Sequence, residues 1–173
     1  LQYRAKGLDE VSCETQAREL QSLCQQYGVP FLLNDNVALA TRINADGVHL
    51  GKDDMSLVEA RALLGGDKLI GVSCYASVDL ATKAQAQGAD YVAFGAVFAS
   101  ATKPNAARVP LDVIRQAKQV LRCPVVAIGG ITPDNAAQVC DAGADLLAVV
   151  GGVFAAQDVK KAAQLLGGCW QGV

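Results

Sequence analysis

Short apolar segments alternate seven times with amphipathic segments, and this alternation limits the possible folds more than any other feature of the chain. The apolar segments have the length and composition of buried strands, which we expect at residues 1–6, 31–34, 47–50, 68–73, 90–95, 124–128 and 145–150. Helices are expected near residues 11–27, 36–44, 56–64, 78–87, 110–121, 133–141 and 157–166. Strands separated by helices pair in parallel, so the sequence predicts an α/β fold.

A three-residue joint recurs where a helical segment gives way to a strand. It reads Asn44-Ala45-Asp46, Gly88-Ala89-Asp90 and Gly143-Ala144-Asp145. Asn or Gly is expected where a helix ends in the left-handed conformation. The recurrence indicates one repeated module, and without a linker or a low-complexity tract we expect a single domain over residues 1–173.

Seven strand–helix modules are one fewer than a closed eight-stranded barrel contains. The chain also opens inside a strand pattern, without a cap or a turn before it. We therefore expect a TIM (β/α)8 barrel that lacks its first βα unit in this chain. The alternative is an open doubly wound sheet, which needs no closure.

The overall charge excludes several classes of partner. A net charge of −2 and a pI near 5.3 offer no general attraction to nucleic acid or to anionic lipid. No apolar run reaches the roughly 20 residues that span a bilayer. A site for an anionic ligand must therefore be a local cluster of cations and backbone amides. The six cysteines form no CxxC pair, which predicts small buried thiols and a reducing cytoplasm.

The first expected strand carries polar residues on one face. Alternation places Gln2, Arg4 and Lys6 together, opposite apolar neighbours. Two cations beside a buried strand are costly to desolvate unless an anion meets them, and Arg in particular matches phosphate oxygens. The alternative is an edge strand with a solvated face.

Carboxylates follow two successive strands. Asp35 comes directly after Asn34 at the end of one strand, and Asp54 follows the next strand. The carboxyl ends of parallel strands meet at one rim, and two carboxylates with a diphosphate form a common shell for Mg²⁺. The alternative is helix capping, by Asp35 for one helix and by Asp53 or Asp54 for the next.

The sequence gives little support for a protein nucleophile. His49 is the only histidine, and inside a strand it is expected to be a hydrogen-bonded core residue rather than a base. Neither a Ser–His nor a Cys–His pair is evident. Ser73 ends its strand, where a hydroxyl can bond to a ligand at the rim.

Three loops at later strand ends suit an anionic ligand. The loop at 96–108 is small and polar and contains Lys103, so it could cover a ligand, or it could be a surface loop without one. Gly129-Gly130 and Gly151-Gly152 each follow a strand and precede a helical stretch. Glycines let backbone amides approach an anion. If the missing first module is counted, these loops follow strands seven and eight of the barrel, where barrels commonly bind phosphate.

Six motifs together resemble the thiamine phosphate synthase family in order and spacing, over essentially the whole chain. They are Gln2-x-Arg4-x-Lys6, Asn34-Asp35, Gly47-Val48-His49-Leu50-Gly51 with Asp54, Gly71-Val72-Ser73, Thr102-Lys103-Pro104 and Ala127-Ile128-Gly129-Gly130-Ile131. The resemblance implies a Mg²⁺-assisted transferase that couples a pyrimidine diphosphate to a thiazole phosphate.

The resemblance also implies a role for each site residue. The pyrimidine diphosphate would be held by Gln2, Arg4, Lys6, Asn34 and Lys103, with Ser73 near its leaving group. The Mg²⁺ ligands would be Asp35 and Asp54. The thiazole phosphate would meet Ser100, Thr102, Gly130, Val150, Gly151 and Gly152. Of these, Arg4, Ser73 and Lys103 would act directly on the leaving diphosphate.

Some positions depart from the family pattern. Lys52 stands where Gln is usual, Asn105 where an acid is usual, Cys74-Tyr75 where a Thr-His-like pair is usual, and Gly151 where Ser is common. Two other functions stay open: a thiazole tautomerase, which would need a rim base near Tyr75, and a non-catalytic barrel that binds phosphorylated metabolites. A homo-oligomer is also left open by the sequence.

Overall fold

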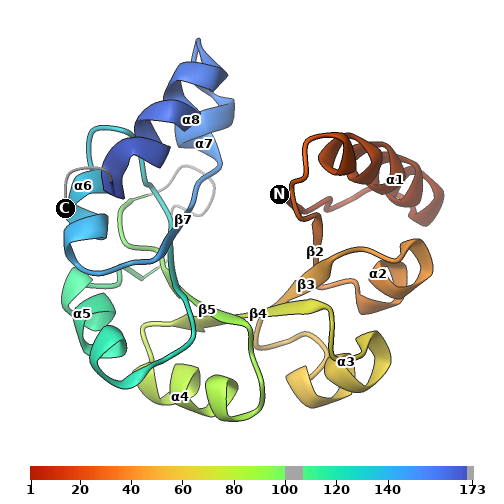
Figure 1. The fold of residues 1–173 in the computed structure, drawn as a ribbon, viewed down its shortest axis with the longest axis horizontal. Helices are drawn as coiled ribbons and strands as arrows, with labels where there is room; N and C mark the ends of the chain where they lie inside the picture. The colour runs from red at the N-terminus through yellow and green to blue at the C-terminus, as the bar shows by residue number, and fades with distance from the viewer. Residues whose placement is uncertain (100–106, 171–173) are drawn as a thin grey trace. The chain divides into compact units, whose positions relative to one another are not determined.

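The computed structural model describes residues 1–99 and 107–170, in which strands and helices alternate as Figure 1 shows. The strands are β1 (Gln2–Tyr3), β2 (Leu32–Asn34), β3 (Gly47–Leu50), β4 (Leu69–Tyr75), β5 (Tyr91–Gly95), β6 (Val125–Ile128) and β7 (Leu146–Ala148). The helices are α1 (Glu10–Gln26), α2 (Val37–Ile43), α3 (Leu57–Leu64), α4 (Val78–Ala86), α5 (Leu111–Val120), α6 (Ala136–Asp141), α7 (Gly151–Phe154), α8 (Val159–Gly167) and the 3₁₀ helix η1 (Gly168–Trp170). Within the described residues, none of these helices has the length and apolar character needed to cross a bilayer.

The chain forms two compact units. The first comprises Leu1–Ser73 and Gln87–Asp90, and the second comprises Cys74–Ala86 and Tyr91–Val173. The described strand pairs inside each unit are parallel and follow chain order. A doubly wound sheet would reverse the order of its early strands, so the order β1-β2-β3-β4 excludes that alternative. The predicted α/β class, with the strand order of a (β/α)8 barrel, is confirmed.

Alternation along the strands of the first compact unit separates a buried set of side chains from a polar set. Helices α1, α2 and α3 lie along one side of these strands in Figure 1. The buried set consists of residues that are at most 2 % exposed, namely Phe31, Leu33, Val48, Leu50 and Ile70. The other set includes the partly exposed Asn34, His49 and Ser73. The sheet therefore buries one face and keeps its polar groups on the other.

The recurring joint fastens neighbouring strands at their amino ends. Its first residue has a positive φ each time, 54° at Asn44, 91° at Gly88 and 96° at Gly143, as expected for the end of a helix. Its aspartate accepts a backbone N–H at the start of the previous strand at 2.7 Å: Asp46 from Phe31, Asp90 from Ile70 and Asp145 from Val125. The N–H of each aspartate donates in return to the carbonyl of the same partner. These three carboxylates are thus structural.

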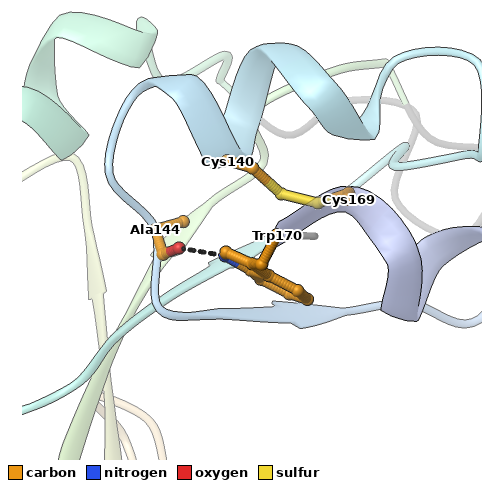
Figure 2. The surroundings of a disulfide bond; sticks show 4 residues. All are labelled: Cys140, Ala144, Cys169 and Trp170. Atoms are coloured by element: carbon orange, nitrogen blue, oxygen red, sulfur yellow. Dashed lines mark hydrogen bonds between the residues drawn. A yellow bond between two sulfur atoms is a disulfide. The ribbon is translucent and has the colours of Figure 1, made fainter. Parts of the chain in front are cut away.

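The end of the second compact unit differs most from the sequence expectation, because α7 and η1 were not predicted. A disulfide joins Cys140 of α6 to Cys169 of η1, with the Cα atoms 6.6 Å apart. Beside it, the Trp170 indole Nε1–H donates to the Ala144 carbonyl at 3.0 Å, as Figure 2 shows. The interpretation of all six cysteines as buried thiols is wrong for this pair. Cys24 and Cys74 are buried free thiols, whereas Cys13 and Cys123 are free and partly exposed.

Candidate active site

Hydrogen bonds connect three of the predicted site residues across β1 and β2. The Gln2 side-chain amide donates to Asn34 Oδ1 at 3.3 Å, and Asn34 Nδ2 donates to Asp35 Oδ2 at 2.7 Å. The backbone N–H of Asp35 donates to the His49 carbonyl at 2.9 Å, and Asp35 has a φ of 57°. This left-handed conformation, which Asp tolerates better than most residues, turns the chain at the end of β2. The Asp35 carboxylate is thereby fixed at the carboxyl end of the sheet.

Asp54 lies at the same end of the next strand. Its Oδ2 accepts the backbone N–H of Gly51, the residue that follows β3, at 2.6 Å. Because Asn34 pairs in register with His49, Asp35 and Gly51 both lie just past the ends of their strands. Among the described residues, Oδ1 of Asp35 and Oδ1 of Asp54 have no hydrogen-bond donor. Each carboxylate therefore keeps one oxygen available for a ligand.

The capping alternative for these carboxylates is wrong. Asn36, not Asp35, caps α2 by accepting the N–H of Leu39 at 2.9 Å. Ser56 caps α3 in a capping box with Glu59, so Asp53 and Asp54 have no capping role there. The pKa of the Glu59 carboxyl is lowered, first by the Ser56 side-chain hydrogen bond. Because both helix starts are satisfied by other residues, Asp35 and Asp54 require another explanation.

Arg4 and Lys6 in the first compact unit have no counter-ion among the described residues. Its arginines other than Arg4 all pair with carboxylates: Arg18 with Glu14, Arg42 with Glu10 and Glu14, and Arg61 with Asp90. Arg4 and Lys6 are exposed, and neither makes a hydrogen bond or an ion pair with any described residue. The expected strand at residues 1–6 is shorter in the structure, where β1 ends at Tyr3, so Arg4 and Lys6 follow the strand and its alternation does not place them on one face. These two side chains can therefore meet an external anion without first breaking an internal pair.

His49 and Ser73 form a hydrogen-bonded pair that the sequence interpretation missed. The distance between His49 Nε2 and Ser73 Oγ is 2.8 Å, and both side chains are partly buried. The imidazole thus contacts a predicted site residue directly. The sequence could have indicated that His49 and Ser73 lie on the same face of neighbouring strands. It could not show that they are in contact, because this depends on the register of β3 and β4.

In the second compact unit, the two glycine loops lie against each other. They follow β6 and β7, which pair with Ile128 opposite Ala148. A Cβ on Gly152 would contact the Ile131 carbonyl oxygen, which shows how closely the two loops pack. Gly130 has a φ of 65°, and a Cβ there would lie 2.8 Å from the Phe98 carbonyl carbon. The structure therefore brings together Gly130, Val150, Gly151 and Gly152, as the sequence predicts.

The start of α7 makes these loops suitable for an anion. Val150 is the N-cap residue, and Gly151 and Gly152 open the helix. Amides in the first turn of a helix have no intrahelical acceptor and carry partial positive charge. A Cβ on Gly151 would meet nothing within 4 Å, so the structure leaves room for a side chain at this position. A Ser would fit at this position.

The two glycines of this loop should respond oppositely to substitution by alanine. In Gly152→Ala, the new methyl would press on the Ile131 carbonyl and lie 2.9 Å from Val149 Cγ1. Overpacking of this kind costs about 1–3 kcal/mol. The matched control Gly151→Ala meets no neighbour and should leave the free energy of unfolding unchanged or raise it by about 0.4–1 kcal/mol. Urea denaturation checks both values, and equal effects of the two changes would contradict the packing described here.

Three predicted site residues lie outside the described residues: Ser100, Thr102 and Lys103. The other predicted site residues are Gln2, Arg4, Lys6, Asn34, Asp35, Asp54 and Ser73 in the first compact unit and Gly130, Val150, Gly151 and Gly152 in the second. A pocket of about 410 Å³ occurs at the opposite, amino ends of β2, β3 and β4, and none of the predicted site residues lines it.

Cys74 is not a reactive thiol, and the described residues do not form a metal site from protein ligands alone. Cys74 is buried, and burial together with the nearby Cys123 raises its pKa to about 12, so it stays a thiol. No group of three or more His, Cys, Asp and Glu side chains in the described part of the chain could hold a metal ion. Two aspartates nevertheless fit Mg²⁺, which commonly keeps several waters and binds through one or two carboxylates and substrate phosphates.

Comparison with known proteins shows which family the sequence matches. A family model described as thiamine monophosphate synthase matches residues 1–153. The thiamine-phosphate synthase of Thioalkalivibrio sulfidiphilus is 55 % identical over 166 residues, which cover 96 % of this chain and 79 % of that protein. The thiamine-phosphate synthase of Azoarcus sp. is 58 % identical over 158 residues, which cover 91 % of this chain and 77 % of that protein.

A solved structure shares the fold. The thiamine phosphate pyrophosphorylase from Pyrococcus furiosus superposes with a TM-score of 0.88 at 35 % identity. The match covers 97 % of this chain and 80 % of that one. Sequence and structure comparisons thus point to the same group of proteins.

Proposed function

The chain belongs to the thiamine monophosphate synthase family, and on this premise we propose that the protein joins a pyrimidine diphosphate to a thiazole phosphate. The substrates are 4-amino-2-methyl-5-hydroxymethylpyrimidine diphosphate and 4-methyl-5-(2-phosphoethyl)thiazole or its carboxylate. The products are thiamine phosphate and diphosphate, which makes the protein a transferase.

One combination in the first compact unit supports the proposal: Arg4 and Lys6 have no counter-ion among the described residues, and Asp35 and Asp54 cap no helix. A magnesium diphosphate requires both kinds of group. Guanidinium and ammonium groups bind phosphoryl oxygens, whereas carboxylates bind the metal. The other three arginines of this unit pair with carboxylates, whereas Arg4 does not.

Each site residue receives a role within this proposal. The residues that hold the diphosphate are Gln2, Arg4, Lys6, Asn34 and Lys103. Asp35 and Asp54 would hold Mg²⁺, and Ser73 contacts the pyrimidine substrate near its leaving group. Ser100 and Thr102 face the thiazole phosphate, and its phosphoryl group binds the amides near Gly130, Val150, Gly151 and Gly152.

The reaction begins with loss of the leaving group. The bond between the pyrimidine methylene carbon and the diphosphate oxygen breaks, and a resonance-stabilised pyrimidine cation remains. The thiazole nitrogen then supplies the electron pair of the new C–N bond. Arg4, Lys103 and Ser73 stabilise negative charge that grows on the departing diphosphate. When bound, Mg²⁺ offsets part of the same charge.

The proposal is tested by mixing the purified protein with both substrates and Mg²⁺ and measuring release of diphosphate. We expect thiamine phosphate and diphosphate to form in equal amounts, and turnover to require Mg²⁺. Tight binding of both phosphorylated substrates without turnover would favour the non-catalytic barrel instead. Isomerisation of the carboxylated thiazole without release of diphosphate would favour the tautomerase.

Arg4 gives a test that requires no turnover. Arg4→Ala removes charge-assisted hydrogen bonds to the diphosphate, which are worth about 1.5–3 kcal/mol together. Calorimetry with Mg²⁺ and diphosphate should therefore show binding weakened by roughly 10- to 100-fold. The matched control is Arg18→Ala, which breaks an exposed pair with Glu14 on α1 and should leave binding unchanged. Equal binding by both variants would contradict the assignment of Arg4 as a ligand of the diphosphate.

A cytoplasmic location is part of the same proposal. Charged phosphate esters do not enter a bilayer readily, so both substrates are expected where they are made. The Cys140–Cys169 disulfide is uncommon in that compartment. Both the location and the disulfide can be tested by fractionating cells, trapping free thiols and measuring whether Cys140 and Cys169 are labelled in the cytoplasmic fraction.

A further inference from the structure

His49 is placed to control the hydroxyl of Ser73. The two residues lie on the neighbouring strands β3 and β4, and 2.8 Å separates Nε2 from Oγ. The residue opposite His49 on β4 is Gly71, which has no side chain to separate the imidazole from Ser73 two positions further along. On the other side, Asn34 pairs in register with His49, but its amide is engaged with Gln2 and Asp35. The imidazole therefore bonds toward β4.

The direction of this hydrogen bond decides what the serine can do. A hydroxyl has one proton and two lone pairs, and a neutral imidazole has one donor and one acceptor nitrogen. If His49 Nε2 accepts the hydrogen bond, Ser73 donates its proton to the imidazole and has only lone pairs left for a ligand. If Nε2–H donates, the serine proton stays available to a phosphoryl oxygen. An anionic leaving group requires the second arrangement.

We infer that His49 is a positioning residue that donates its Nε2–H to Ser73 and so directs the serine proton toward the leaving diphosphate. This inference rests on the proposed function, because it takes the anion at Ser73 to be the diphosphate. His49 also ties the serine to the metal side of the site, since its carbonyl accepts the Asp35 N–H at 2.9 Å. His49 thus fixes the backbone of Asp35 and the side-chain hydroxyl of Ser73.

The hydrogen-bond direction can be measured without any turnover. His49 is the only histidine, so ¹⁵N-labelled protein gives one unambiguous pair of imidazole nitrogen signals. With Mg²⁺ and diphosphate present, we expect Nε2 to carry a proton and Ser73→Ala to shift its signal. An unprotonated Nε2 would overturn the inference. This result stands even if the protein proves inactive, so it is separate from failure of the proposed function.

Kinetics then test whether the pair acts as a unit. His49→Leu should lower kcat by roughly 10- to 100-fold with little change in KM. The reason is that the Ser73 hydroxyl loses its orientation, whereas the binding site for the substrate is kept. His49→Gln keeps an N–H donor near the Nε2 position and should recover most of that loss. In a Ser73→Ala background, His49→Leu should change kcat less than about 3-fold. The same loss in both backgrounds, or no recovery with Gln, would show a purely structural role and overturn the inference.

Discussion

Replacing Asp35 by Asn should lower the kcat of the coupling reaction by about 100- to 1,000-fold, whereas Asp53→Asn should leave it within about 2-fold. The substitution is nearly isosteric, and its amide oxygen can still accept the hydrogen bond from Asn34 Nδ2. What it removes is the negative charge that holds Mg²⁺ beside the diphosphate. Rates of diphosphate release measured over a Mg²⁺ series check the result, and the variant should need far more Mg²⁺ to approach its own maximum.

Asp53 is a matched control for this experiment. It is exposed like Asp54, its direct neighbour, and the described residues show no hydrogen bond or ion pair for it. Both variants lose one carboxylate charge from the same end of the first compact unit, so a general effect of surface charge would affect both equally. A comparable loss in the two variants would contradict the assignment of Asp35 as a metal ligand, and so would an unchanged Mg²⁺ dependence in Asp35→Asn.

The sequence predicted the strands and helices well because their signals are local. The recurring joint is an example: Asn44, Gly88 and Gly143 each mark a left-handed helix end, and the structure has a positive φ at all three. The strand ends that carry Asn34-Asp35 and Gly129-Gly130 were likewise readable from a few adjacent residues. α7 was missed because four residues beginning with Gly-Gly contain too little periodicity to predict a helix.

The capping alternative failed for a reason that the sequence itself contains. Ser56 and Glu59 have the spacing of a capping box, which outcompetes Asp54 for the start of α3. Asn36 is as good a cap as Asp and lies one residue nearer to α2 than Asp35. These neighbouring residues satisfy both helix starts, so the local sequence already favours a role other than capping for the two aspartates.

The features that sequence reasoning could not reach depend on contacts between distant residues. The His49–Ser73 bond joins residues 24 positions apart and requires the register of β3 against β4. The Cys140–Cys169 bond spans 29 positions and requires η1 to lie against α6. Neither register nor helix docking is encoded in a short motif, so six scattered cysteines and one histidine looked unremarkable.

Reduction of the Cys140–Cys169 bond should lower the free energy of unfolding by about 3–4 kcal/mol, the value expected when a loop closed over 29 positions is opened. The loop contains β7, α7 and α8, so the loss falls on the elements that carry Gly151 and Gly152. Thermal denaturation with and without dithiothreitol should show Tm falling by roughly 10 °C on reduction. Trp170, the only tryptophan, lies next to Cys169, and its fluorescence should report the release of η1 from α6.

Cysteine variants separate this bond from any general effect of the reductant. Cys169→Ser should show the lower Tm at once and should no longer respond to dithiothreitol, whereas Cys13→Ser, which changes a free thiol, should respond like the unaltered protein. Alkylation of the denatured protein before reduction should label only Cys13, Cys24, Cys74 and Cys123, and all six cysteines should react afterwards. Labelling of all six before reduction would show that the bond is not formed. The stability of the loops near Gly151 would then depend on noncovalent contacts, among them the hydrogen bond from Trp170 to Ala144 that joins η1 to the segment after α6.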